Sequence, residues 1–211
     1  MPDDKMVFYH SGASRPVLRK IRDVCPSLRH GNGWTPRYFF DRKHCYFLDN
    51  GAFTSSFNPE EWVRMLEKVR EFESSPDFVV LPDKFNNPEK TFERSKKYVG
   101  EARDRGYSYY YAAQKPESPE SAVRKAQRLD ADGVFIGGDF DWKIRETSNI
   151  VDIAHERGFK AHIGMPGDYF WAYRTGADSM DSSTVGRNKQ YRRMRSLERS
   201  INQQKSILGF F

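Results

Sequence analysis

The sequence predicts a TIM-like (β/α)8 barrel in which residues 1–211 form a single domain. From Cys45 onward, short apolar segments alternate with segments of helical periodicity, a pattern typical of parallel strands joined by right-handed crossovers. No GxGxxG motif follows the first strand, which disfavours an open dinucleotide-binding sheet. Nearly every predicted strand ends in a polar residue, and a closed barrel brings those ends to one mouth. At 211 residues the chain is short for a barrel of about 250, so we expect trimmed loops or an incomplete turn.

The predicted strands are short, apolar and bounded by turn residues. They are Met6–Tyr9, Cys45–Leu48, Phe78–Leu81, Tyr107–Ala113, Gly133–Ile136, Phe159–Ile163 and Asp178–Met180. Residues 10–44 show the weakest pattern, and there we expect one helix over Pro16–Val24 followed by a loop.

Helix starts are marked by a capping residue followed by proline, at Asn58-Pro59, Asn87-Pro88 and Ser118-Pro119. The helices carry apolar stripes wide enough to cover a sheet. The stripes comprise Trp62, Met65, Leu66, Val69 and Phe72; Ala122, Val123, Ala126 and Leu129; and Ile150, Val151 and Ala154.

Composition limits the class of protein. The net charge of +6 permits nucleic-acid binding without establishing it. Two cysteines, five scattered histidines and no CxxC pair argue against a zinc site, so we expect neither metal nor cofactor. The first residues lack a secretory pattern and no apolar stretch is long enough to span a membrane, so we expect a cytoplasmic protein.

Polar residues at the strand ends are the candidate site, although each also has an ordinary structural interpretation. Asp49-Asn50-Gly51 also fits a turn, Asp83 a helix cap, and Gly137-Gly138 a tight turn. Asp181 fits a turn cap, and His162 fits a core histidine at least as well as a catalytic one.

The order of these residues resembles that of the guanine transglycosylases, which exchange a base in tRNA or DNA. The similar segments span roughly residues 45–190. They are Leu48-Asp49-Asn50-Gly51-Ala52-Phe53, Leu81-Pro82-Asp83, Ala113-Gln114, Phe135-Ile136-Gly137-Gly138, His162-Ile163-Gly164-Met165-Pro166 and Gly176-Ala177-Asp178-Ser179-Met180-Asp181, followed by Arg187.

The resemblance implies a role for each position. Asp181 would attack the sugar and form a covalent glycosyl intermediate, and Asp49 would be the general acid/base, a pairing that retaining glycosyl transfer requires. The substrate-binding residues would be Asp83, Gln114, Gly137, Gly138, Phe53, His162 and Arg187. Of these, Asp83 and Gln114 would bind the purine edge, a backbone N–H of Gly137 or Gly138 would bind its O6, and Phe53 would stack on it.

The expected partners are nucleic acid and a free 7-deazaguanine base. The zinc-binding insertion of the tRNA enzymes is missing, which favours the DNA-modifying branch of phages and bacteria over tRNA. The expected phosphate contacts are Lys189, Arg192, Arg193 and Arg195, a basic run for which a solvated helix start is the alternative. Rival functions are a tRNA-guanine transglycosylase, a glycoside or N-glycoside hydrolase that uses the same carboxylates, and a non-enzymatic nucleic-acid-binding barrel.

Overall fold

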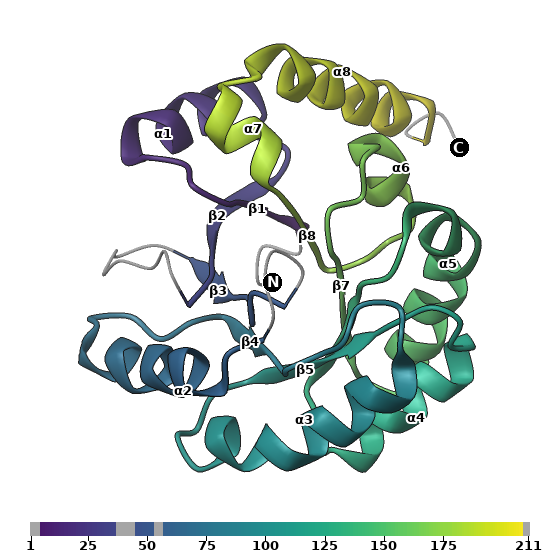
Figure 1. Ribbon diagram of the computed structural model, residues 1–211. Helices are drawn as coiled ribbons and strands as arrows, with labels where there is room; N and C mark the ends of the chain where they lie inside the picture. Colours follow the sequence, from purple (N-terminus) through teal and green to yellow (C-terminus); the bar gives the residue numbers. More distant parts are fainter. Residues whose placement is uncertain (1–4, 37–44, 53–56, 209–211) are drawn as a thin grey trace.

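The computed structural model describes residues 5–36, 45–52 and 57–208 of the chain. Eight parallel strands close into a barrel, each pairing with the next along the chain and the last pairing back onto the first (Figure 1). The strands are β1 (Val7–His10), β2 (Arg29–Trp34), β3 (Tyr46–Leu48), β4 (Phe78–Val80), β5 (Tyr109–Ala113), β6 (Gly133–Ile136), β7 (Lys160–Ile163) and β8 (Ser179–Ser182). The (β/α)8 prediction is confirmed, and the barrel closes with all eight strands despite the short chain.

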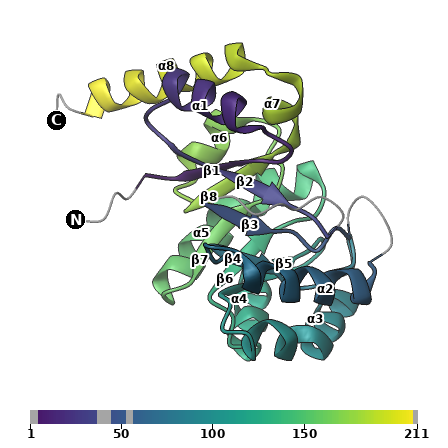
Figure 2. The same cartoon turned by 90° about the vertical axis from the view of Figure 1, so that its left-hand side faces the viewer.

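Helices surround the barrel, as the side view shows (Figure 2). They are α1 (Arg15–Val24), α2 (Pro59–Lys68) with the short 3-10 helix η1 (Val69–Glu71), α3 (Pro88–Arg103), α4 (Pro119–Arg128), α5 (Phe140–Glu156), α6 (Tyr169–Arg174), α7 (Ser183–Asn188) and α8 (Tyr191–Leu208). No helix in the described part of the chain combines the length and apolarity needed to cross a membrane.

The predicted helix starts are confirmed by side-chain caps. The Asn58 side chain accepts hydrogen bonds from the N–H groups of Glu60 and Glu61, and Asn87 accepts one from Lys90. Each cap satisfies backbone donors that the first turn of a helix leaves without a partner. The caps therefore fix where α2 and α3 begin.

Strand β2 was not predicted, because its sequence Arg-His-Gly-Asn-Gly-Trp has no apolar run. Its glycines are instead required by packing. A Cβ on Gly31 would lie 2.6 Å from the Cys45 carbonyl oxygen, and one on Gly33 would lie 2.7 Å from the Phe47 ring. Close packing against its neighbours, rather than side-chain hydrophobicity, therefore places this segment in the barrel.

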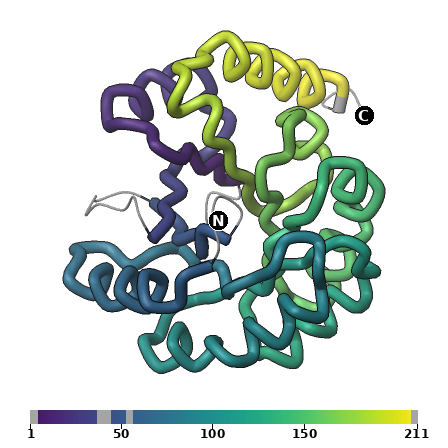
Figure 3. The backbone as a smooth tube through the Cα atoms, viewed as in Figure 1, coloured from purple at the N-terminus to yellow at the C-terminus, as the bar shows by residue number. Residues whose placement is uncertain are grey.

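One layer of the barrel interior is formed mainly by aromatic side chains. Tyr9, Phe47, Phe78 and Tyr110 form one buried cluster, in which the Phe78 and Tyr110 rings stack with centroids 4.0 Å apart. A separate core lies between the strands and the helices. In Figure 3 the purple β1 segment runs beside the yellow-green segment that carries β8, and this pairing closes the barrel. The register of that pair sets Tyr9 opposite Asp181, which belongs to β8 itself and not, as predicted, to the segment after the last strand.

Candidate active site

The carboxyl ends of the strands surround a pocket of about 250 Å3. Five positions predicted from the sequence line it together: Asp49, Asp83, Gln114, Gly137-Gly138 and Asp181. They come from five different strands or the turns that follow them, as is usual for active sites in this fold. Its volume lies just below the usual range of about 300–1,000 Å3 for ligand pockets and suits a small molecule.

Two of the four carboxyl groups that line this pocket hold their protons more tightly than usual. Burial, together with the negative charges of Asp181 and Asp83, raises the pKa of Asp49 to about 7. Burial likewise raises the pKa of Asp83 to about 6. Near neutral pH the protonated and ionised forms of Asp49 therefore coexist, which is the condition for a group that both donates and accepts protons.

Gln114 braces the pocket wall. Its side-chain nitrogen donates to Asp83 Oδ2 at 2.5 Å, and its Oε1 accepts from the N–H groups of Asn86 at 3.0 Å and Gly138 at 3.1 Å. The N–H of Gly137 donates to the carbonyl of Ala113. Both glycine N–H groups therefore already have acceptors within the protein. The resemblance had assigned one of them to the O6 of a bound purine.

The turn after β7 connects Asp181 to a buried lysine. Met165 has a positive φ of 45°, an uncommon conformation for a residue with a side chain. In this conformation its N–H donates to Asp181 Oδ1 at 3.1 Å, and its carbonyl accepts from Lys143 Nζ at 3.0 Å. The strained turn therefore holds an acid and an amine at the same pocket.

His162 orients Asp181 from inside the barrel. Its Nε2 lies 3.2 Å from Asp181 Oδ1, and its Nδ1 lies 2.8 Å from the hydroxyl oxygen of Ser179. The imidazole is fully buried and stacks on Phe135, and burial lowers its pKa below the ordinary value. A neutral ring facing a carboxylate carries its proton on Nε2, so Nδ1 accepts from Ser179. His162 supports the pocket and is absent from its lining.

Lys143 is a site residue that the sequence analysis missed. It lies on α5, it is only 6% exposed, and its Nζ donates to the Gly164 carbonyl at 2.6 Å as well as to Met165. Burial lowers its pKa, an effect that the nearby Asp181 opposes. A signal was present, because Lys143 falls on the same helical stripe as Thr147, Ile150 and Ala154. A lysine on a buried stripe points toward a specific site.

The remaining predicted residues lie away from this pocket or outside the described residues. Arg187 is exposed on α7 and its side chain packs beside Gly12. Lys189, Arg192, Arg193 and Arg195 are exposed, and none of them lines the pocket. Arg193 donates to the Gly167 carbonyl and its guanidinium lies over the Tyr169 ring. Phe53 lies outside the described residues.

No protein-family profile matches the sequence, and no curated protein is significantly similar to it. Solved structures share its fold. An aldolase designated QR15 superposes with a TM-score of 0.59 and 13% identity over 99% of both chains. Dihydrodipicolinate synthase of Thermotoga maritima gives 0.56 and 12% over 92% of this chain and 79% of its own. An archaeal fructose 1,6-bisphosphate aldolase gives 0.54 and 13% over 94% of each. At these identities the likeness establishes the barrel fold.

These similarities overturn the assignment to the guanine transglycosylases. The structures of similar fold are aldolases and a synthase, so the predicted family, the pentosyltransferase activity and the base exchange in DNA are wrong. The same finding overturns the nucleic-acid and 7-deazaguanine partners, the phage DNA-modification setting, and the alternative tRNA and glycoside hydrolase functions. The physical reason is that polar residues following successive strands are a property of barrel mouths in general.

Among the described residues, no group of three or more His, Cys, Asp or Glu side chains is arranged to hold a metal ion. Within the pocket, Asp83 is held by Gln114, and Asp181 is held by Met165 and His162. What the described pocket offers to a ligand is therefore proton transfer, one buried amine and a partly apolar wall that includes Val80 and Phe135.

Proposed function

We propose that the protein is an enzyme of the lyase class that acts on a small carbonyl compound bound in the mouth pocket. The observation that carries this proposal is Asp49, a carboxyl group whose pKa of about 7 suits proton transfer at neutral pH. The pocket volume of about 250 Å3 supports a small substrate. Aldolase-type lyase chemistry is supported by the names of the structures with the same barrel, which is an analogy of fold.

In this proposal Asp49 takes a proton from the carbon next to the substrate carbonyl. Electrons of that C–H bond move toward the carbonyl oxygen and form an enolate, which the same carboxyl group reprotonates in the reverse direction. Asp181 and Asp83 raise the proton affinity of Asp49 and so make it a stronger base than an ordinary aspartate. Asp181 itself is held in place by Met165 and His162.

Exchange of carbon-bound hydrogen tests this role of Asp49. In D2O, the enzyme is expected to replace the methyl protons of pyruvate or the hydroxymethyl protons of dihydroxyacetone phosphate, followed by loss of the proton NMR signal. Asp49→Asn should slow the exchange by about a hundredfold or more, since general acid–base groups contribute that much. Asp152→Asn, which removes an exposed carboxylate on α5, should exchange like the wild type. Equal rates for Asp49→Asn and the wild type would contradict the proposal.

Lys143 favours a second candidate within the same class, in which the substrate is bound covalently. A neutral lysine amine has two N–H donors and one lone pair, and the Gly164 and Met165 carbonyls accept both donors. The lone pair is then available to attack a carbonyl carbon, forming a C–N bond and releasing water as the imine forms. A lowered pKa increases the neutral fraction of the amine.

Borohydride trapping tests the imine. Treatment with pyruvate and borohydride should reduce the C=N bond, leaving a stable secondary amine that mass spectrometry locates on Lys143. Lys143→Met should form no such adduct, whereas Lys96→Met, at an exposed position of α3, should be labelled like the wild type. If the adduct forms on another lysine or on none, Lys143 does not bind the carbonyl carbon. The hydrogen-exchange assay tests the role of Asp49 independently of this result.

A further inference from the structure

The mouth pocket has a rim of exposed apolar side chains. In the part of the chain that the structure describes, the large apolar side chains with high exposure are Phe85, Phe140, Ile144, Met165 and Ile207. Of these, Phe85, Phe140 and Met165 line the pocket of the candidate site, and their exposed fractions are 40%, 46% and 46%. One exposed apolar residue is ordinary, but several around one pocket mark a surface that binds an apolar group.

The rim residues come from three separate segments of the chain. Phe85 follows β4, Phe140 is the first residue of α5 after β6, and Met165 lies in the turn after β7. The closed barrel, rather than the periodicity of one helix, therefore brings these side chains together at the ends of its strands.

The local backbone accommodates two of these side chains. A Cβ on Gly167 would lie 2.9 Å from the Phe140 ring, so the glycine leaves space for this ring close to the turn that carries Met165. Met165 has its positive φ of 45° although its side chain is exposed and fills no space in the core. Uncommon backbone conformations of this kind cluster at functional sites. The rim is therefore a built feature of the mouth.

The rim continues an apolar wall that begins inside the pocket. Val80 and Ala112 are buried, Phe135 is half-buried, and all three line the pocket together with Asp49 and Lys143. The pocket has a volume of only about 250 Å3, so it holds a small polar group. The rest of a larger ligand must leave the pocket past the rim.

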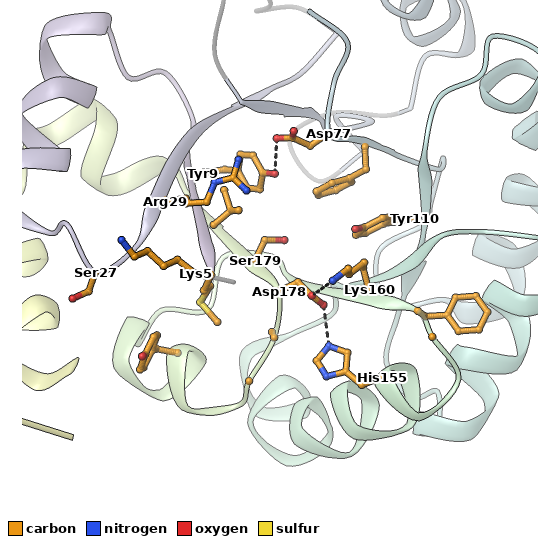
Figure 4. Close-up of a pocket in the computed structure, with 18 of the residues that line it drawn as sticks. Lys5, Tyr9, Ser27, Arg29, Asp77, Tyr110, His155, Lys160, Asp178 and Ser179 are labelled. Carbon is orange, nitrogen blue, oxygen red and sulfur yellow. Dashed lines mark hydrogen bonds and ion pairs between the residues drawn. The ribbon is translucent and has the colours of Figure 1, made fainter. Parts of the chain in front are cut away.

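The larger cavity at the opposite end of the barrel, where the strands begin, has a different character. Its volume is about 1110 Å3, and none of the large, highly exposed apolar side chains of the described residues lines it. Charged side chains gather there instead, among them Lys160 and Asp178, which pair at 2.7 Å, and His155, which lies 2.9 Å from Asp178 (Figure 4). An apolar group is therefore expected at the mouth and not at this end.

We propose that the substrate of the mouth pocket carries an apolar chain or ring, which lies against Phe140 and Met165 while its carbonyl end lies at Asp49 and Lys143. The two rim side chains select this substrate, because contact with its apolar part removes water from both surfaces. The inference rests on the proposed function for the carbonyl end of the substrate. Its apolar end is a separate claim, since proton transfer at Asp49 does not require it.

Three 2-oxo acids with the same polar end test the rim. Pyruvate has no tail, 2-oxo-4-phenylbutanoate has an apolar ring, and 2-oxoglutarate has a second carboxylate. In titration calorimetry, 2-oxo-4-phenylbutanoate is expected to bind with a Kd at least about tenfold lower than either of the others, because its ring is removed from water. In the D2O exchange assay, its kcat/KM should exceed that of pyruvate by about the same factor.

Variants of the rim locate the contact. Phe140→Ser and Met165→Asn should each raise the Kd of 2-oxo-4-phenylbutanoate by about fivefold and reduce its advantage over pyruvate. Asparagine tolerates a positive φ, so Met165→Asn removes the apolar side chain and keeps the turn, which keeps the test valid if Phe140→Ser fails to fold. Ile207→Ser, which removes an apolar side chain of 62% exposure near the end of α8, should bind all three acids like the wild type.

Several outcomes would overturn the inference. They are equal Kd values for pyruvate and 2-oxo-4-phenylbutanoate, no measurable binding of the latter, and an advantage that persists in both rim variants. A wild-type dimer that Phe140→Ser dissociates in sedimentation would assign the rim to contact with a second copy of the chain. Exchange of pyruvate and 2-oxo-4-phenylbutanoate at equal rates would keep the role of Asp49 and remove that of the rim. Tight binding of 2-oxo-4-phenylbutanoate without exchange would keep the rim and contradict the role of Asp49.

Discussion

Asp49→Asn is expected to make the folded protein more stable at pH 8, by about 2–4 kcal/mol. The folded state raises the pKa of this carboxyl from 3.8 to about 7, so the folded chain binds the proton more tightly than the unfolded chain. The folded state gains stability because it binds this proton more tightly than the unfolded chain does. This contribution is complete below about pH 4 and is lost as the pH rises toward 7. Asparagine stays neutral at every pH and avoids the cost of ionising a carboxyl in this pocket.

Urea unfolding between pH 4 and pH 8 checks this expectation. The wild-type free energy of unfolding should fall across this range more steeply than that of Asp49→Asn. Asp152→Asn, at an exposed position, should follow the wild-type curve. Parallel curves for the wild type and Asp49→Asn would show that the folded state does not raise the pKa of Asp49.

His162→Phe is expected to cost about 2–4 kcal/mol of stability, although phenylalanine keeps an aromatic ring at the position. The imidazole donates to Asp181 and accepts from Ser179 inside a fully buried aromatic layer. Phenylalanine makes neither hydrogen bond, so it leaves a buried carboxylate oxygen with the Met165 N–H alone and a buried hydroxyl without an acceptor.

Ser179→Ala provides the graded comparison. It removes only the hydroxyl that donates to His162 and keeps the bond between His162 and Asp181, so its cost should be about 1 kcal/mol. Thermal or urea unfolding of both variants measures the difference. Equal stability of His162→Phe and the wild type would mean that His162 only fills space. In the exchange assay, His162→Phe should also alter the pH profile, since Asp181 is no longer oriented beside Asp49.

Most of the barrel could be predicted because its strands are apolar and its helices carry marked starts. The segment Tyr109–Ala113 is buried throughout, and Asn58 and Asn87 cap their helices as their place before proline predicts. Strand β2 could not be predicted in this way. Gly31 and Gly33 lie there because neighbouring residues fill the space that their side chains would need, a relation that exists only in three dimensions.

The candidate site was partly predictable for a similar reason. The sequence places Asp49, Asp83 and Gln114 directly after strands, and a closed barrel gathers such positions at one mouth. Lys143 comes from a helix rather than a strand end, so the same rule does not find it. The chemistry was not predictable from order alone, because barrels with unrelated activities share a succession of polar residues at their mouths.

Titration of the aspartate carboxyl carbons by 13C NMR tests the role of Asp49 most directly. The Asp49 signal, assigned by its loss in Asp49→Asn, should titrate with a midpoint near pH 7 in the wild type. In a variant with Asp181→Asn, the midpoint should move down, because one of the negative charges that raises it has been removed. A wild-type midpoint near 4, unchanged by Asp181→Asn, would contradict Asp49 as the proton-transfer group of this pocket.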